Sequence, residues 1–339
     1  MRTSRIQPLL FALCLSALTA PAAHAWSAYG HQTVGRIADQ LIAGSNAEKQ
    51  VRTLLGNITL KDAAVWADCA KGVTENDGVW KYSVNPRYRE CQPFETTEAR
   101  KAAMVDFVSR NAEHCGPGTS DLVCRHKSYH YTDVSNLRDH YDKDFTGTSD
   151  HDIVSAIKAC ILVLQGKPAP VPFNIKNKKE ALLLLAHYMG DIHQPLHVAA
   201  VYLDKDGHIV DPDAGAFDSA TETRGGNDID DGSEVLHGEW DSIPSVLATT
   251  LQGPDGVTEA GAVPKTRGAM IGWPTSWASD TLRASSGAFK PLSFGKQNAD
   301  EHWPATHANT YAKARRDLQR KQLVKGGARL AQILTTLWP

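Results

Sequence analysis

Residues 187–197 read HYMGDIHQPLH, and they place metal-binding side chains at helical spacing. His187 and Asp191 are four residues apart, so on a helix they lie on one face about one turn from each other. The apolar pattern of the preceding residues predicts a helix over 179–192. Pro195 ends that helix and places His197 on the loop that follows.

The same His-x-x-x-Asp spacing returns in His237-Gly238-Glu239-Trp240-Asp241, within a second predicted helix over 233–251. Either pair alone is equally well explained as an ion pair on a helix surface. Two pairs together with His197 favour a shared site. Imidazole and carboxylate groups suit zinc, and two facing helices can supply four such ligands to one cluster.

Helical periodicity also dominates the rest of the chain. Apolar residues three and four apart predict further helices over 30–42, 153–164 and 315–337. Alternating runs of β-branched residues, which would form a sheet, are nearly absent. Polar segments at 71–97 and 203–232 exceed the usual length of a connection, and loops that long often carry function. We therefore expect an all-α fold, a single helical domain with long loops around a metal-binding cleft.

The composition is that of an ordinary globular protein, with 42% hydrophobic and 22% charged residues. Lys plus Arg number 36 against 38 Asp plus Glu, which gives a formal net charge of -2. That balance excludes a protein that holds duplex nucleic acid by a basic surface, so any phosphate site has to be charged locally. The motifs of serine hydrolases, phosphate-loop enzymes and His-Glu-x-x-His metalloproteases are absent from the sequence.

Residues 1–25 have the pattern of a secretory signal peptide. Arg2 and Arg5 precede an apolar run over 9–18, and Ala23-His24-Ala25 supplies small residues at the positions that a signal peptidase reads. The run is shorter than the roughly 20 residues that span a bilayer, so we expect no membrane anchor. The mature domain would be residues 26–339, a monomer that is secreted or periplasmic.

Five cysteines remain in this mature chain, where an oxidising compartment favours disulfides. Cys115 and Cys124 bracket one polar loop, and Cys69 and Cys91 bracket another. The sequence suggests these two pairs, with other pairings still open. Cys160 lies in an apolar run and is expected to be a buried thiol.

Three upstream stretches offer further ligands: Trp66-Ala67-Asp68, His130 between two tyrosines, and His31 five residues after Trp26. In their order and spacing, the whole set resembles the secreted zinc-dependent type I nucleases. This is the family of mung bean nuclease and its fungal relatives, which shares a superfamily with bacterial zinc phospholipase C. The resemblance covers most of the mature chain, and its markers are Trp26 with Gly30-His31, Trp66 to Asp68, His130-Tyr131-Thr132-Asp133, Gly190 to His197, Arg224-Gly225-Gly226-Asn227 and His237 to Asp241.

The resemblance implies a trinuclear zinc cluster and a ligand set for each ion. The ligands would be Asp68, His130, His187 and Asp191 for the first zinc, His197, His237 and Asp241 for the second, and Trp26, His31 and Asp191 for the third. Trp26 would bind through its free amino group and its carbonyl oxygen, and Asp191 would bridge two ions and orient the attacking hydroxide. An amine binds zinc only when neutral, and signal cleavage would create one at Trp26 with a pKa near about 8.

The resemblance also implies a zinc-dependent endonuclease and 3′-nucleotidase, which cleaves single-stranded DNA and RNA to 5′-nucleotides. Lys71 would act in catalysis by steadying the phosphate, and Asn227 would contact phosphate or base. Tyr131 would stack on a nucleobase and Asp133 would contact the edge of that base. Stacking tolerates every base and requires an unpaired strand. Simple packing of Tyr131 against the ligand helix is an equal alternative.

Two other functions compete with this one. A zinc-dependent phospholipase C would use a very similar ligand set on glycerophospholipids, and Tyr131, Asp133 and Lys71 favour the nuclease over it. A zinc-storage or structural protein would fill every coordination position with protein ligands. The nine ligand residues implied here leave room for water and substrate on three ions.

Overall fold

Helix α8 (Lys178–Asp191) is the centre of the fold in the computed structural model, which describes residues 26–232 and 234–339. Asn177 caps this helix, because its Oδ1 accepts a hydrogen bond from the backbone N–H of Glu180 at 3.0 Å. Every residue from Glu180 to Asp191 is buried. The run Leu182–Leu185 has no polar face, and such a helix is stable only when it is covered on all sides. The predicted signal peptide and Ser233 lie outside the described residues.

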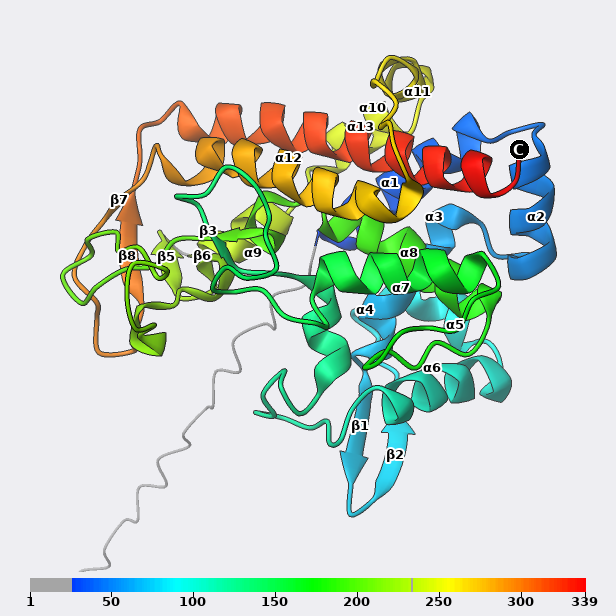
Figure 1. Ribbon diagram of the computed structural model, residues 1–339, viewed down its shortest axis with the longest axis horizontal. Helices are drawn as coiled ribbons and strands as arrows, with labels where there is room; N and C mark the ends of the chain where they lie inside the picture. The colour runs from blue at the N-terminus through cyan, green and yellow to red at the C-terminus, as the bar shows by residue number, and fades with distance from the viewer. Residues whose placement is uncertain (1–25, 233) are drawn as a thin grey trace, which may run out of the picture.

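Long helices cover α8 (Figure 1). It contacts α1 (Ala28–Leu41), α7 (Ile153–Leu164) and α13 (Tyr311–Leu337), and α12 (Trp273–Phe289) lies beside α13. Helices α1 and α13 approach closely at Gly327, where a Cβ atom would lie 2.5 Å from Cβ of Ile37. The expectation of a mainly helical domain is confirmed.

The other helices are shorter. They are α2 (Asn46–Leu55), α3 (Leu60–Ala63), α4 (Trp66–Ala70), α5 (Gln92–Glu95), α6 (Glu98–Arg110), α9 (Leu236–Asp241), α10 (Ser245–Leu251) and α11 (Pro254–Gly261). Short 3-10 turns are η1 (Arg89–Cys91), η2 (Arg125–His130), η3 (Pro195–His197), η4 (Ser219–Thr221), η5 (Arg224–Gly226) and η6 (Met270–Gly272).

Short strands occur in and around the segments that were expected as loops. They are β1 (Val73–Asn76), β2 (Val79–Tyr82), β3 (Val134–Ser135), β4 (Ala199–Ala200), β5 (Ile229–Asp231), β6 (Glu234–Val235), β7 (Ser293–Phe294) and β8 (Trp303–Thr306). Strands β1 and β2 form an antiparallel hairpin, β3 pairs in parallel with β4, and the rest form a sheet in the order β6-β5-β8-β7. Strands of two to four residues are too short to show the alternation that sequence analysis detects.

The predicted helix over 233–251 is wrong, because the structure has two helices there. Helix α9 ends at Asp241 and α10 begins at Ser245. Pro244 lies between them, and its ring removes a backbone donor and disfavours helical geometry at Ile243. The other predicted helices are present with ends shifted by a few residues, and the helix predicted over 153–164 matches α7.

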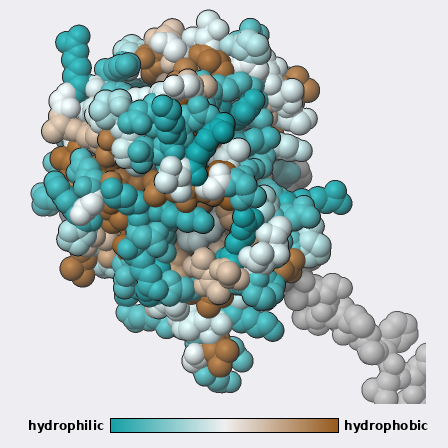
Figure 2. Space-filling view, turned by 90° about the vertical axis from the view of Figure 1, so that its right-hand side faces the viewer, coloured by the Kyte–Doolittle hydropathy of each residue, from teal (hydrophilic) through white to brown (hydrophobic). Residues whose placement is uncertain are grey.

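Both suggested disulfides are present, Cys69–Cys91 and Cys115–Cys124, and Cys160 is a buried free thiol. The first bond joins α4 to η1, and the second closes the loop before η2. None of the helices in the described ranges combines the length and the apolar character needed to cross a bilayer. The face on the right of Figure 1 is mainly hydrophilic, with its apolar side chains in small separate groups (Figure 2).

An ion-pair cluster joins α12 to α13 and makes stability depend on pH. Oδ2 of Asp280 lies 2.8 Å from Nζ of Lys325 and 2.7 Å from Nη2 of Arg329. Oδ1 lies 3.9 Å from Nη2 of Arg283. Burial alone would raise the pKa of Asp280, but the bonds to Lys325 and Arg329 outweigh it and lower the pKa to about 2.

We expect Asp280→Asn to lower the free energy of unfolding by about 1 to 2 kcal/mol at neutral pH. Because the folded-state pKa is depressed, this stabilisation is complete above the unfolded pKa near about 4 and is lost as the pH falls through about 2. Urea unfolding at several pH values measures it. The exposed Asp317, paired with Lys313 on one helix, provides the control Asp317→Asn, for which little change is expected. If the difference in free energy of unfolding between wild type and Asp280→Asn stayed constant on acidification, the ion pairs of Asp280 would not be the cause of the pH dependence.

Candidate metal centre

Asp191 is fully buried at the end of α8, and its carboxylate is surrounded by imidazole rings. Oδ2 lies 3.0 Å from Nδ1 of His130 and 3.0 Å from Nε2 of His187. Oδ1 lies 3.3 Å from Nε2 of His31 and 3.6 Å from Nδ1 of His197. His187 and Asp191 therefore share one helix face, and the carboxylate contacts histidines from four different segments.

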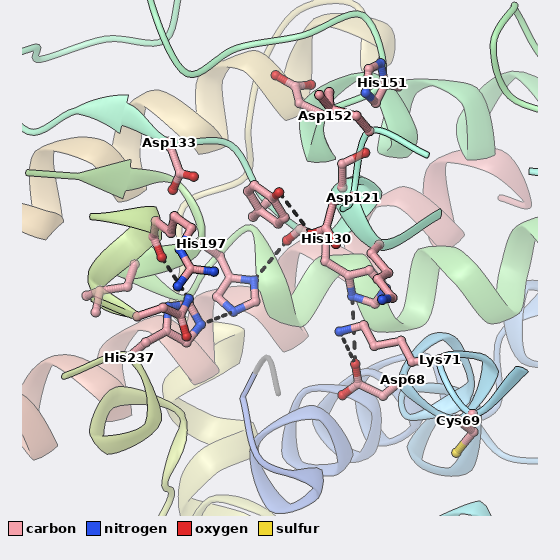
Figure 3. A pocket seen from close by; sticks show the side chains of 18 of the residues that line it. Asp68, Cys69, Lys71, Asp121, His130, Asp133, His151, Asp152, His197 and His237 are labelled. Atoms are coloured by element: carbon pink, nitrogen blue, oxygen red, sulfur yellow. Dashed lines mark hydrogen bonds and ion pairs between the residues drawn. The ribbon is translucent and has the colours of Figure 1, made fainter. Parts of the chain in front are cut away.

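Helix α9 and the turn η3 form a second group beside Asp191. Nε2 of His237 lies 3.3 Å from Oδ2 of Asp241, one helical turn later. Nε2 of His197 lies 3.1 Å from Nε2 of His237 and 3.8 Å from Oδ1 of Asp241. All three side chains are buried. The second His-x-x-x-Asp pair thus converges with His197, and Figure 3 shows His237 of this pair beside His197.

Helix α4 brings Asp68 to the other side of the cluster. Its Oδ1 lies 3.6 Å from Nε2 of His187 and 3.9 Å from Nδ1 of His130. Nζ of Lys71 lies 2.8 Å from the same oxygen, as Figure 3 shows. Burial would lower the pKa of Lys71, but the charges of Asp68 and Asp191 and the hydrogen bond to Asp68 together outweigh burial, and the pKa is raised. Lys71 is therefore a cation at the edge of the cluster.

The unsatisfied atoms of this cluster fit bound cations. Buried atoms without a hydrogen-bond partner among the described residues include Nε2 of His130, Oδ1 of Asp191, Oδ2 of Asp241 and both ring nitrogens of His31. Leaving such atoms unpaired costs about 1 to 3 kcal/mol each. Within this cluster, three of the sets found among the described residues have ligand atoms within 4.8 Å of one another: His31 with Asp68 and His187, His130 with His187 and Asp191, and His197 with His237 and Asp241.

Backbone carbonyls orient three of the histidines. The Nδ1 atoms of His187, His197 and His237 donate to the carbonyl oxygens of Ala64, His130 and Gly225 at 2.6, 2.9 and 2.8 Å respectively. The Nε2 atoms are then left for a metal. Burial lowers the pKa of His130 and His237 to about 3, so both rings stay neutral, which is the form that binds metal.

Trp26 lies against both ligand helices. Its side chain is fully buried, and Nε1 donates to the carbonyl oxygen of Gly190 at 2.9 Å. The backbone N–H of Ser27 donates to the carbonyl oxygen of Asp241 at 2.7 Å. Gly190 cannot carry a side chain here, because a Cβ atom would lie 2.5 Å from Nδ1 of His31. The backbone of Trp26 is thereby held next to the cluster.

A cleft of about 1020 Å³ opens from the cluster. Its lining includes the predicted ligands Asp68, His130, His197 and His237 and the predicted substrate residues Lys71, Tyr131, Asp133 and Asn227. The other predicted ligands do not line the cleft. The site thus has a buried layer of ligands and an open side that a substrate can reach.

The predicted substrate residues occupy the wall beyond the cluster. The hydroxyl of Tyr131 donates to Oδ2 of Asp121 at 3.1 Å. Asp133 is buried, and burial raises the pKa of its carboxyl group well above the usual range. Nδ2 of Asn227 donates to the carbonyl oxygen of Arg224 at 2.8 Å, which ties the half-buried Asn227 to the turn η5.

Two residues that orient predicted site residues were not themselves predicted from the sequence. Gln194 is fully buried, and its Nε2 donates to Oδ1 of Asp241 at 2.8 Å, which orients that carboxylate. Its position inside the stretch 187–197 was the only available signal. Asp121, which holds Tyr131, lies in the loop closed by Cys115 and Cys124. No spacing or motif marks Asp121 in the sequence.

Comparisons with known proteins agree with this geometry. Endonuclease 1 of Arabidopsis thaliana is 27% identical over 243 residues, which are 65% of this chain and 66% of that protein. Endonuclease 2 of Arabidopsis thaliana is 28% identical over 193 residues, 57% of this chain and 51% of that protein. The matches thus span less than two thirds of either relative. The S1/P1 nuclease family model matches residues 26–115 and 119–338, and the chain therefore belongs to the S1/P1 nuclease family.

Proposed function

We propose that this protein is a zinc-dependent nuclease that cleaves single-stranded DNA and RNA to 5′-nucleotides and removes the phosphate from 3′-nucleotides. One observation carries the proposal: buried His and Asp side chains from α1, α4, η2, α8, η3 and α9 converge at the base of one open cleft. Family membership supports the nuclease, and the names of the two plant relatives are consistent with it.

We assign three zinc ions to the cluster, with Asp68, His130, His187 and Asp191 for the first, His197, His237 and Asp241 for the second, and Trp26, His31 and Asp191 for the third. Zinc bound there supplies Lewis acidity, which activates water near neutral pH and stabilises the charge that develops at phosphorus. Asp191 would serve as a ligand in two of these sets, because its Oδ1 contacts His31 and its Oδ2 contacts His187.

Lys71 and the base-binding residues position the substrate. Lys71 contributes a positive charge beside Asp68, where a phosphate would enter from the cleft. The ring of Tyr131 stacks on a nucleobase. Asp133 contacts the edge of that base, and Asn227 contacts the base or the phosphate. A base in a duplex is already stacked on both faces, so stacking on Tyr131 selects an unpaired strand.

We also propose that the protein is exported and that signal cleavage before Trp26 completes the metal centre. The two disulfides support an oxidising compartment. The contacts of Trp26 with Gly190 and of Ser27 with Asp241 support the amine as a ligand, because they hold this part of the chain beside the cluster.

Substrate choice tests this function against its two rivals. We expect the zinc-loaded protein to hydrolyse single-stranded DNA and a 3′-mononucleotide and to leave phosphatidylcholine intact. Hydrolysis of phosphatidylcholine alone would assign a phospholipase C. Full zinc occupancy without turnover of any of these substrates would assign a storage or structural role.

Tyr131→Ala should raise KM for a 3′-mononucleotide by about tenfold or more, because base stacking contributes about 1 to 3 kcal/mol. Tyr131→Phe retains the ring and loses only the hydrogen bond to Asp121, so we expect a smaller rise in KM. Steady-state kinetics of the two variants measure the difference. Equal KM values for wild type and Tyr131→Ala would show that Tyr131 only packs against its neighbours.

A further inference from the structure

The cleft is larger than the proposed site requires. Pockets for small ligands measure about 300 to 1,000 Å³, so a cleft of about 1020 Å³ has room for more than one nucleotide. The metal cluster, Tyr131 and Asp133 line one part of it. Another part of the wall is formed by the loop after β2, by the disulfide-closed loop at Asp121 and Leu122, and by Lys127 on η2.

Lys127 is a cation without a partner on this wall. Its Nζ forms no hydrogen bond or ion pair within the described ranges, whereas Lys71 is paired with Asp68. Two of the carboxylates that line the cleft accept hydrogen bonds from tyrosine hydroxyls. Asp121 accepts from Tyr131 at 3.1 Å, and Asp152 accepts from the hydroxyl of Tyr141 at 2.6 Å. The charge of Lys127 is therefore available to an anion in the cleft.

Lys127 lies on the same short turn as a predicted metal ligand. Lys127 and His130 belong to the 3-10 turn η2, are three residues apart and both line the cleft. Side chains at this spacing in a 3-10 helix lie on the same face, and a rise of about 2.0 Å per residue separates them by about 6 Å along the axis. A strand whose scissile phosphate lies at the cluster therefore has a cation beside the path of its neighbouring phosphate.

Apolar side chains at the rim of the same wall suit a base. Leu122 is 75% exposed and Val84 is 54% exposed, and both line the cleft together with Tyr88. Single-strand binding sites combine a positive charge for the backbone with aromatic or apolar surfaces for the bases. This wall has both within one cleft.

We propose that this wall is a second nucleotide subsite, in which Lys127 binds the phosphate next to the scissile one and Leu122, Val84 and Tyr88 contact the adjoining base. The inference rests on the proposed nuclease function and names its preferred substrate class, single-stranded oligonucleotides rather than 3′-mononucleotides.

The test compares Lys127→Gln with wild type on a thymidine trinucleotide and on thymidine 3′-phosphate. We expect the ratio of kcat/KM for the trinucleotide to kcat/KM for the 3′-phosphate to fall about tenfold, mainly through KM. The dependence of log kcat/KM on log salt for the trinucleotide should become shallower by about 0.7, the value for one phosphate contact on a single strand. Lys49→Gln, on the exposed surface of α2 and outside the cleft, is the charge-matched control.

Leu122→Asn provides a second variant, which retains Lys127 and should lower the same ratio with no change in the salt slope. An unchanged ratio and slope in Lys127→Gln, with both substrates hydrolysed by wild type, overturns the subsite and leaves the nuclease function in place. Wild-type protein that hydrolyses neither substrate overturns both proposals.

Discussion

Asp191→Asn is expected to reduce the turnover of single-stranded DNA by about three orders of magnitude, equivalent to about 4 kcal/mol in activation free energy. Asparagine matches the shape of aspartate but loses its charge and one acceptor oxygen. The carboxylate contacts His31, His130, His187 and His197 at 3.0 to 3.6 Å, and no other described carboxylate contacts as many of the ligand histidines. We therefore expect loss of zinc together with loss of activity.

Asp39→Asn is the matched control for this variant. Asp39 is a partly buried aspartate of α1 whose two oxygens accept the backbone N–H groups of Leu60 and Lys61 at 3.1 Å each. Its replacement should cost about 1 kcal/mol of stability and leave zinc content and turnover unchanged. If Asp191→Asn kept the zinc content and turnover of the wild type, the Asp191 carboxylate would not be a zinc ligand.

A chain that retains extra residues before Trp26 is expected to bind less zinc and to have little or no nuclease activity. The added peptide bond converts the amine into an amide, which is not a zinc ligand at neutral pH. Zinc content and turnover are measured on a chain with Gly-Ser before Trp26 and on one that begins at Trp26.

The control carries the same Gly-Ser after Pro339, far from Trp26 in sequence, and should match the unextended chain. A protease site between Gly-Ser and Trp26 adds a rescue, since cleavage should restore zinc binding and activity. Full activity of the uncleaved chain would refute the role of the Trp26 amine.

The sequence predicted those features that depend on local spacing. His187 and Asp191 lie one turn apart on α8, and His237 and Asp241 lie one turn apart on α9, as the four-residue interval requires. The long amphipathic helices were predicted for the same reason. The single helix expected over 233–251 is broken at Pro244, where the backbone constraint of proline outweighs the helical pattern of the surrounding apolar residues.

Most contacts between distant parts of the chain were not predicted; the shared site of the two His-x-x-x-Asp pairs and the Cys69–Cys91 disulfide are exceptions. The hydrogen bonds of Gln194 to Asp241 and of Tyr131 to Asp121 cannot be inferred from the positions of these residues in the sequence. The four-stranded sheet is built from strands of two to four residues, two near 230 and two near 300, and such pairing has no local signal. The assignment of individual zinc ligands came from the family resemblance and not from periodicity.

The metal content of the purified chain beginning at Trp26 tests the central claim most directly. Elemental analysis after dialysis against zinc-free buffer should give about three zinc per chain, with Asp191→Asn lower. A value of one zinc or none per chain would contradict a trinuclear centre built from these residues.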